Sequence, residues 1–349
     1  MRLNTEHNMD LSIIIVNWNS AAFVKKCLES VYANADGLDY EIVVIDNGTF
    51  DQCREVVRAH FPAVRFIQSD TNLGFSGANN LASKTCRGRN LLFLNPDTEI
   101  VGPALQTLVS FLDSTPAAGI AGPKLLNTDL SIQTSCIQRF PTILNQVFDS
   151  EALRSSFPKS SFWGTRPLLI DSTPVKVEVI VGACLMIKAS VFSQIGCFHS
   201  DYFMYAEDVD LCFSARQAGW KSFYVPASRV VHHGGGSSDN QTENHFAAIV
   251  MRESVLKFFA RKRGRVYAAL FRSATAAAAL CRVGLLAILV PFARNGHRLS
   301  RRVALRRWIK LFRWAIGGEK WASQLGRKND DKDEIQRRAG NSCYVAAGE

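Results

Sequence analysis

The stretch Leu11–Ser20 reads LSIIIVNWNS, and its first half is a short run of β-branched apolar residues that stops at Asn17. Such a run is typical of a strand that is buried on both faces of a sheet. Apolar residues then recur at helical spacing over residues 21–33, with Asn19 or Ser20 as the expected N-cap. The sequence therefore predicts that the ordered chain begins with a buried strand followed by a helix.

The alternation of strand-like and helix-like segments continues over the first hundred residues. Strand-like runs occupy 41–46 (EIVVID), 64–67 and 90–94 (NLLFL), and helix-like segments occupy 51–60 and 75–86. Strands that alternate with helices form βαβ units, which build a parallel sheet covered on both faces. We therefore predict an α/β fold with a mostly parallel central sheet. Ligands of such sheets bind beyond the carboxyl ends of the strands.

The pattern weakens after residues 119–126. Residues 127–173 carry Ser, Thr and Pro without clear periodicity, which is typical of a functional or mobile loop. The elements predicted beyond it are strands over 175–187, broken at Gly182, and over 221–225, and a helix over 205–219. A domain boundary is expected between about residues 240 and 260, where the composition changes.

The overall composition excludes several classes of protein. Of 349 residues, 47% are hydrophobic and 21% are charged, which is ordinary for a globular protein and unlike a disordered or collagen-like chain. The nine cysteines form no C-x-x-C pair, so neither a zinc ribbon nor a thioredoxin-type site is expected. Residues 1–10 are polar and lack the features of a signal peptide. We expect a reduced, cytoplasmic protein whose thiols are mostly free and buried.

The charge is distributed unevenly along the chain. Residues 1–250 have a net charge of −5 and residues 251–349 one of +15. Between Ser254 and Gly318 there are 15 Lys or Arg residues and no acidic residue. Such a segment suits an anionic partner such as phospholipid, nucleic acid or a polyphosphate, although a solvated helix face is the alternative interpretation.

Two carboxylates follow predicted strands. Asp46 could accept hydrogen bonds from a nucleobase or a ribose hydroxyl, or it could simply form the turn that Asn47-Gly48 favours. Asp97, in the sequence Asn95-Pro96-Asp97, could hold a hard cation beside a diphosphate, or it could belong to a type I turn.

A second group of ionisable residues lies later in the chain. Glu207, Asp208 and Asp210 open a predicted helix, where they either repel one another and yield a general base or simply favour the positive end of the helix dipole. His232 precedes a glycine-rich turn, and we favour a metal-ligand role for it over a structural one.

Taken together, the order of these motifs resembles that of the inverting family-2 glycosyltransferases of the GT-A fold, and within them the bacterial rhamnosyltransferase-like group. The resemblance covers about residues 11–240, and the matching motifs are Val16-Asn17-Trp18-Asn19, Val44-Ile45-Asp46-Asn47-Gly48, Asn72-Leu73-Gly74-Phe75 with Asn79, Leu94-Asn95-Pro96-Asp97-Thr98, Gly182-Ala183-Cys184-Leu185-Met186-Ile187, Phe203-Met204-Tyr205 with Glu207-Asp208-Val209-Asp210, and His232 with Gly234-Gly235.

The resemblance implies a role for each site residue. Asp208 would be the catalytic base that accepts the proton of the acceptor hydroxyl. The implied donor-nucleotide residues are Asn17, Asp46, Asn47, Asn72, Gly74, Asn79 and Asn95. The implied acceptor-binding residues are Glu207, Gly182 and Ala183. Asp97 and His232 would bind a divalent metal, Mg²⁺ or Mn²⁺, although the first position of the family's D-x-D motif is Asn95 here.

The basic segment 255–315 mixes Lys and Arg with apolar residues. A membrane span over 273–293 would enclose Arg282, which is costly at the centre of a bilayer. We therefore expect basic amphipathic helices that lie on an anionic membrane surface. The predicted division of the chain is an N-terminal tail (1–10), a GT-A domain (11–250), membrane-associating helices (251–318) and a polar, disordered tail (319–349).

These observations predict an inverting hexosyltransferase of cell-surface polysaccharide synthesis, cytoplasmic and peripheral to the inner face of the membrane. The preferred donor is dTDP-rhamnose and the preferred acceptor is a saccharide, either free or polyprenyl-linked. Galactosyl or N-acetylhexosaminyl transfer from a UDP-sugar is the alternative. A nucleotidyltransferase is disfavoured because residues 16–20 lack a glycine-rich, basic phosphate loop. The acidic first 250 residues disfavour a nucleic-acid-binding protein without catalysis, and no nucleic-acid partner is expected.

Overall fold

The structure is a computed structural model, which describes residues 9–148, 160, 162, 164–165, 173–234, 245–291 and 295–325. The chain divides into two compact units. The first comprises residues 1–140, 151–200 and 207–237, and the second comprises 141–150, 201–206 and 238–349. The two short segments 141–150 and 201–206 therefore belong to the second unit, although the residues on either side of them in the sequence belong to the first.

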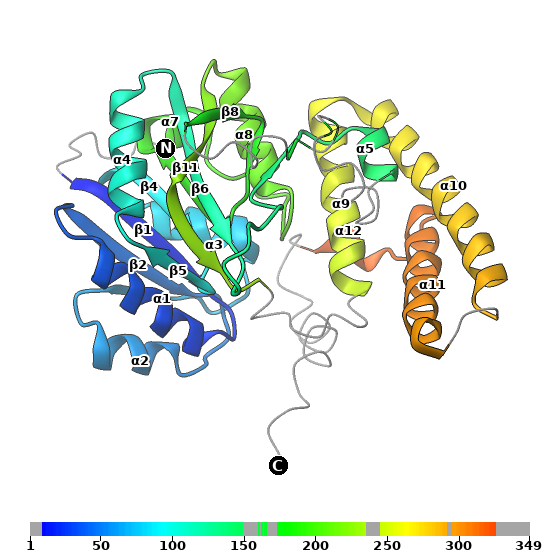
Figure 1. Cartoon of the computed structure of the whole chain (residues 1–349), viewed down its shortest axis with the longest axis horizontal. Coiled ribbons are helices and arrows are strands. Elements are labelled where there is room, and N and C mark those ends of the chain that lie inside the picture. The colour runs from blue at the N-terminus through cyan, green and yellow to red at the C-terminus, as the bar shows by residue number, and fades with distance from the viewer. Residues whose placement is uncertain are drawn as a thin grey trace, which may run out of the picture. The chain divides into compact units, whose positions relative to one another are not determined.

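The first unit is built on one nine-stranded sheet (Figure 1). Its strands lie in the order β3-β2-β1-β4-β10-β6-β11-β5, with β8 paired to β11. The strands are β1 Met9–Asn17, β2 Tyr40–Asp46, β3 Arg65–Gln68, β4 Gly88–Leu94, β5 Thr98–Val101, β6 Ala118–Leu126, β8 Val175–Val177, β10 Cys184–Lys188 and β11 Lys221–His232. A two-stranded sheet pairs β7 (Ile137–Gln138) with β9 (Val179–Ile180). The helices of this unit are α1 Ala21–Asn34, α2 Cys53–His60, α3 Gly74–Ser83, α4 Ala104–Ser114, α7 Ala189–Gln194 and α8 Glu207–Gln217.

The opening strand lies at the centre of the parallel half of this sheet. β1 pairs in parallel with both β2 and β4, and β2 pairs in parallel with β3. The side chains of Ile13, Ile14 and Ile15 are fully buried, which explains why this strand is a continuous apolar run rather than an alternating one. The register places Asn17 of β1 beside Asp46 of β2, so their polar side chains meet at the carboxyl edge.

The prediction of an α/β fold with a mostly parallel sheet is confirmed, with two corrections. β10, predicted only as a strand, runs antiparallel between β4 and β6 and interrupts the parallel order. The sequence analysis also missed α4 and β5. The predicted irregular segment 127–173 contains β7 and the helix α5 (Ile143–Val147) among its described residues.

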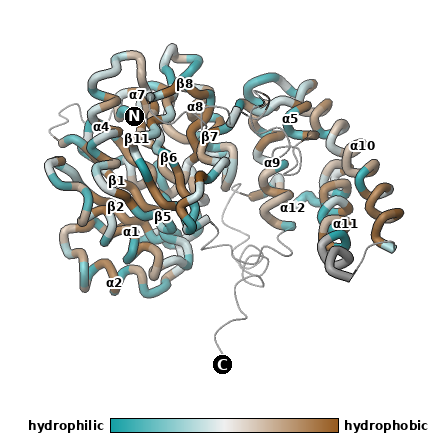
Figure 2. Tube along the Cα trace, in the orientation of Figure 1, coloured by the Kyte–Doolittle hydropathy of each residue, from teal (hydrophilic) through white to brown (hydrophobic). Residues whose placement is uncertain are grey.

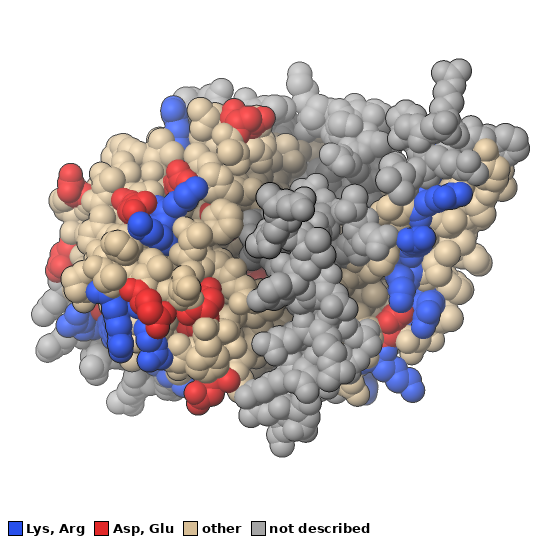
Figure 3. Space-filling model, turned by 90° about the horizontal axis from the view of Figure 1, so that it is seen from below, with Lys and Arg blue, Asp and Glu red and all other residues tan. Residues whose placement is uncertain are grey.

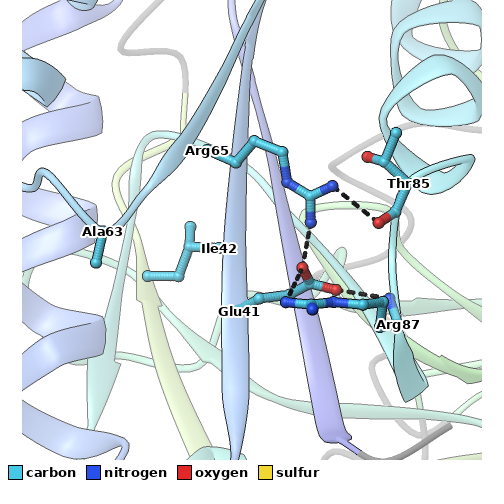
Figure 4. A pocket seen from close by; sticks show the side chains of 6 residues that line it. All are labelled: Glu41, Ile42, Ala63, Arg65, Thr85 and Arg87. Carbon is cyan, nitrogen blue, oxygen red and sulfur yellow. Dashed lines mark hydrogen bonds and ion pairs between the residues drawn. The ribbon is translucent and has the colours of Figure 1, made fainter.

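A hollow of about 410 Å³ lies at the opposite, amino-terminal edge of the strands (Figure 4). Its centre is Glu41, which accepts hydrogen bonds from the hydroxyl of Ser12 (2.8 Å) and the backbone N–H of Arg87 (2.6 Å) and pairs with the guanidinium of Arg65. Because one carboxylate links β1, β2, β3 and the approach to β4, we interpret this hollow as a structural junction.

The second unit is helical. It contains α5, α9 (His245–Lys262), α10 (Arg265–Leu289), α11 (Asn295–Ala315) and α12 (Trp321–Gln324). Inside it, Glu253 of α9 is buried and accepts a hydrogen bond from the indole of Trp314 in α11 (2.8 Å). Figure 2 shows hydrophilic and hydrophobic residues alternating along α11, whereas the strands of the first unit are mostly hydrophobic. The described cysteines are free, and most are buried, as the sequence predicts.

Candidate active site

The carboxyl edge of β1 and β2 carries a network of amides and carboxylates. The amide nitrogen of Asn17 donates to Asp46 Oδ2 and to Asp51 Oδ1, both at 2.9 Å. The amide oxygen of Asn17 accepts from the backbone N–H and the hydroxyl of Ser20, each at 3.1 Å. Ser20 is the N-cap residue of α1, as predicted, although its side chain makes no capping hydrogen bond to that helix.

The carboxylate of Asp46 shapes the turn that follows β2. Its Oδ1 atom accepts from the backbone N–H groups of Gly48 (3.0 Å) and Thr49 (2.9 Å) and from the side-chain amide of Gln68 (2.8 Å). Burial raises the pKa of Asp46, but hydrogen bonds from Thr49, Gln68 and Asn17 outweigh it and hold the pKa below its usual value. Asp46 is thus a buried anion, and a ligand that hydrogen-bonds to it shares its oxygens with these donors.

Asn47 connects this turn to the loop before α3. Its amide oxygen accepts from the backbone N–H of Leu73 (2.8 Å), and its amide nitrogen donates to Asn72 Oδ1 (3.0 Å). Gly74, which opens α3, has φ +70°, a conformation that L-residues with side chains rarely adopt. The predicted residues Asn17, Asp46, Asn47, Asn72 and Gly74 therefore form one hydrogen-bonded set of loops.

Asp97 and His232 lie together at the ends of neighbouring segments. The Oδ1 atom of Asp97 is 3.4 Å from Nε2 of His232, and both side chains are largely buried. The other ring nitrogen of His232, Nδ1, is 2.7 Å from Oε1 of Gln133, whose own Nε2 donates to Asn127 Oδ1 (3.2 Å). Because an amide oxygen only accepts, Nδ1 of His232 carries a proton, and Nε2 is the ring nitrogen that faces Asp97.

This arrangement fits a divalent cation. A carboxylate oxygen and an imidazole nitrogen face each other, and a cation such as Mn²⁺ binds both kinds of ligand. A hydrogen bond on the second ring nitrogen is the usual feature that orients a metal-binding histidine. Within the described residues, no group of three or more His, Cys, Asp or Glu side chains could hold a metal ion. A cation bound to Asp97 and His232 would therefore complete its coordination with ligand oxygens and water.

Asp208 and Glu207 lie in the first turn of α8, and both are more than nine-tenths buried. Asp208 Oδ2 accepts from the backbone N–H of Gly182 (2.9 Å), and Oδ1 accepts from that of Val209 (2.7 Å). Burial raises the pKa of Asp208, against the lowering effect of these two hydrogen bonds. Burial and the adjacent Asp208 charge raise the pKa of Glu207 to about 8, and its Oε2 atom has no hydrogen-bond partner among the described residues.

Gly182 and Ala183 connect two parts of the site, the Asp208 carboxylate and the Asn95-Pro96-Asp97 loop. Gly182 donates to Asp208, and the carbonyl of Ala183 accepts from the backbone N–H of Asn95 (2.9 Å). A Cβ atom on Gly182 would lie 3.5 Å from the ring of Phe75, which follows Gly74 at the start of α3. The loop before α3, the Asp97 loop and the first turn of α8 are thus neighbours at one edge of the sheet.

The structure therefore brings nearly all predicted site residues to this edge. Asn79 is buried within α3 and donates to the carbonyl of Phe75 (2.9 Å), so it contacts its own helix. The sequence analysis missed Gln68, Asp51 and Gln133 as parts of the site. Gln68 ends β3, so the rule of carboxyl-end loops could have identified it, whereas no sequence signal marks Gln133.

Two family models match the chain. The model "Glycosyl transferase family 2" matches residues 12–196, which is more than half of the chain and includes most of the site. The model "Glycosyl transferase family group 2" matches residues 163–318, a range that includes α8 and most of the second unit.

Curated relatives and a solved structure show the same similarity. The N-acetylglucosaminyl-diphospho-decaprenol L-rhamnosyltransferase of Mycobacterium tuberculosis is 28% identical over 251 residues, which cover 68% of this chain and 80% of that protein. Rhamnosyltransferase WbbL of Escherichia coli is 26% identical over 260 residues, covering 72% and 93%. A mannosyltransferase of Pyrobaculum calidifontis in complex with GDP-Man and Mn²⁺ aligns with a TM-score of 0.53 and 16% identity over 89% of this chain and 87% of that one. The last comparison supports the fold alone.

Proposed function

The chain belongs to glycosyl transferase family 2, and from this premise we propose that it transfers L-rhamnose from dTDP-rhamnose to a saccharide on a polyprenyl diphosphate. Two rhamnosyltransferases among its relatives support the donor sugar, and the decaprenol-linked substrate named for one of them supports the acceptor class. The glycosyltransferase would act in the synthesis of a cell-surface polysaccharide. In this proposal residues 11–250 carry catalysis and residues 251–318 attach the enzyme to the inner face of the cytoplasmic membrane.

One observation carries the proposal. Two successive residues, Gly182 and Ala183, hold the Asp208 carboxylate and the backbone of Asn95 by hydrogen bonds of 2.9 Å each. An inverting transferase needs its base across the anomeric carbon from the leaving diphosphate and within the same site, and this segment joins Asp208 to the loop that ends in Asp97. The loops that carry Asn17, Asp46 and Asn47 would hold the nucleotide. The donor site would also include Asn72, Gly74, Asn79 and Asn95. The acceptor would lie against Glu207, Gly182 and Ala183.

In the proposed mechanism, Asp208 accepts the proton of the acceptor hydroxyl as that oxygen attacks the anomeric carbon. The sugar passes through an oxocarbenium-like state, and a single displacement inverts the anomeric centre. No covalent intermediate with the enzyme forms, so no nucleophilic side chain is required. The raised pKa of Asp208 suits this role, because a base works best when its pKa approaches the ambient pH.

Asp97 and His232 would hold a divalent cation, Mg²⁺ or Mn²⁺. When bound, such a cation neutralises charge on a leaving diphosphate. The Mn²⁺ in the structurally similar mannosyltransferase supports a cation in this fold. Within this chain, Gln133 fixes the proton on the far ring nitrogen of His232 and leaves Nε2 ready to coordinate.

The first test is thermal stability with dTDP, UDP and GDP, each with and without Mn²⁺. A ligand at about 100 times its Kd adds about 2.7 kcal/mol to the free energy of unfolding, which is a readily visible shift. We expect dTDP or UDP with Mn²⁺ to give the largest shift, followed by turnover with dTDP-rhamnose. A larger response to UDP with turnover of a UDP-sugar would favour galactosyl or N-acetylhexosaminyl transfer. A folded sample that responds to no nucleotide contradicts the proposal.

A second prediction concerns Gln133. The substitution Gln133→Leu removes the acceptor for His232 Nδ1–H and frees the ring to rotate or change tautomer. Loss of such a supporting hydrogen bond weakens metal binding by about 10–100-fold. Mn²⁺ titration followed by electron paramagnetic resonance, in the presence of dTDP, measures this directly. Gln217→Leu changes an exposed glutamine at the end of α8 and is the matched control. Equal Mn²⁺ affinity in both variants would rule out the positioning role of Gln133.

A further inference from the structure

The longest helix of the second unit exposes a face that carries no charge. In α10, the exposed residues recur at helical spacing and lie along one side of the helix. Apart from Arg265, which opens the helix and is also exposed, they are Val266, Ala269, Leu270, Ser273, Ala277, Leu280, Cys281, Gly284, Leu285, Ala287, Ile288 and Leu289. Val266 is 76% exposed, Leu280 58% and Ile288 65%, so large apolar side chains face outward in the first two turns and again from Leu280 to the end, with the small residues Ser273 and Ala277 between them. We refer to these twelve residues as the apolar stripe.

The two arginines beyond the first turn of α10, Arg272 and Arg282, bind backbone carbonyls of other segments. Arg272 donates to the backbone carbonyls of Trp314 and Ala315, each at 2.9 Å. Arg282 donates to the carbonyl of Val147 (2.7 Å), and its guanidinium lies 4.4 Å from the ring centroid of Trp308. Both charges are therefore used inside the second unit, where they hold α10 against α11 and the end of α5.

The neighbouring helix exposes the opposite chemistry. α11 packs against α10, and four of its exposed residues, Arg302, Arg306, Ile309 and Arg313, follow one another at intervals of four, three and four residues, with exposed Arg307 beside them. They form one face of the helix, which we call the arginine stripe. Neither α10 nor α11 contains an acidic residue. Figure 3 shows Lys and Arg side chains in a column on this unit, next to an uncharged surface.

We propose that α10 lies in the plane of an anionic bilayer with the apolar stripe immersed, while the arginine stripe of α11 binds lipid phosphates. Charge complementarity indicates that the partner of these two stripes is an anionic bilayer. Such a bilayer offers phosphates to the arginine stripe and hydrocarbon to the apolar stripe at once, whereas an acidic protein surface would match only the arginine stripe. The inference rests on the proposed function, in which residues 251–318 attach the enzyme to the membrane that carries the acceptor, and it adds which faces of which helices make the attachment.

The structure favours this in-plane orientation over a span. α10 is long and apolar enough to cross a membrane, and only 11% of its most apolar window is buried. A span would nevertheless place Arg272 and Arg282 in the hydrocarbon region, together with the segments whose carbonyls they bind. One of those segments is the end of α11, the helix that carries the arginine stripe. An orientation in the interface lets all these groups reach headgroups or water.

The test uses the full-length protein and vesicles of phosphatidylcholine alone or with 30% phosphatidylglycerol. We expect sedimentation with the anionic vesicles and much weaker binding to the neutral ones. Replacing two exposed arginines, Arg302→Gln with Arg306→Gln, is expected to weaken binding about tenfold to thirtyfold, since each basic residue near an anionic surface contributes about a factor of five. The matched control, Arg58→Gln with Arg229→Gln, alters exposed arginines of the first unit and should bind like the unmodified protein.

A second pair of variants tests the apolar stripe. Leu280→Glu with Leu285→Glu is expected to weaken vesicle binding at least tenfold, whereas Leu130→Glu, at a leucine that is 66% exposed in the first unit, should not. Sugar transfer to a short, water-soluble acceptor should be unchanged in the stripe variants. Lost vesicle binding with retained transfer confirms the inference separately from the proposed function, and absent transfer with normal binding would overturn the function alone.

The depth of spin labels in the bilayer distinguishes a helix that lies in the membrane plane from one that spans the membrane. Nitroxides are placed at Val266→Cys and at Ile288→Cys, each in a background with Cys281→Ser and Cys343→Ser. We expect equal, shallow depths in anionic vesicles. Depths on opposite leaflets would establish a span and overturn the inference. Lipid-free dimers that the Leu280→Glu and Leu285→Glu changes dissociate, without vesicle binding by the unmodified protein, would assign the stripe to a second copy instead.

Discussion

Asp208→Asn is expected to lower sugar transfer by about 10²–10⁴-fold, the range that a positioned general base contributes. Nucleotide affinity should remain, because Asp208 hydrogen-bonds to Gly182 and Val209 and to none of the loops around Asp46. An amide has one oxygen where the carboxylate has two, so one backbone N–H loses its acceptor at a cost of about 1–3 kcal/mol. The assay therefore combines initial rates with a melting curve and a dTDP titration at a temperature where the variant is folded.

The matched control is Asp210→Asn, which also replaces a buried carboxyl group with an amide in the first turn of α8. We expect this variant to retain transfer, so that a loss confined to Asp208→Asn assigns the effect to the position and not to the charge of the helix terminus. Near-normal turnover in Asp208→Asn would refute the base assignment.

The pH dependence offers a second readout of the same carboxylate pair. Because burial raises the pKa values of Glu207 and Asp208, the rate should increase with pH as the pair loses its proton. At pH values between the ordinary pKa of a glutamate and about 8, the folded protein holds a proton that the unfolded chain has released. Stability should therefore fall as pH rises through this window, with a slope of at most about 1.4 kcal/mol per pH unit. Glu207→Gln should flatten that slope, and an unchanged slope would exclude Glu207 as its source.

Asp97→Ala is expected to abolish the Mn²⁺-dependent part of nucleotide binding and to reduce transfer by at least 10²-fold. The substitution removes the only carboxylate that faces His232 Nε2 among the described residues, so the imidazole alone would hold the cation. The thermal shift with dTDP should then be the same with and without Mn²⁺. Asp36→Ala, at an exposed carboxylate in the turn after α1, is the control and should respond like the unmodified protein.

The opposite outcome for Asp97 is equally informative. A full Mn²⁺-dependent shift in Asp97→Ala would place the cation elsewhere and remove Asp97 and His232 as a metal pair. A protein whose nucleotide response never depends on metal would retain the transferase function while excluding the cation from its mechanism.

The parallel half of the fold could be predicted from sequence because its signals are local. Leu11–Val16 and Glu41–Asp46 are short apolar runs, and each ends at a polar residue that marks the carboxyl edge of the sheet. α4 was missed although Leu105, Leu108, Val109 and Leu112 have the helical spacing of a buried face. The antiparallel direction of β10 could not be predicted, since a strand that is buried on both faces has the same composition in either direction.

The candidate site was predictable to the extent that it follows strand ends. Asp46, Asp97 and His232 lie where the rule of carboxyl-end loops places them. Gln133 was not predictable, because it reaches His232 from 99 residues away through a hairpin that leaves no motif. The contacts of Gly182 with Asp208 and Phe75 likewise depend on long-range packing, and a glycine alone does not reveal what approaches it.

The position of β10 between β4 and β6 has a consequence for the order in which the protein can fold on the ribosome. β4 has been synthesised at Leu94, but its partner on that side begins only at Cys184, about 90 residues later. At roughly 5–20 residues per second, the open edge of β4 must wait about 4–18 s for that partner. An unpaired apolar edge is a site for wrong pairing with other nascent chains. The first half of the sheet can therefore assemble early, but it is protected from aggregation only after the Gly182 segment, and with it the catalytic edge, has left the ribosome.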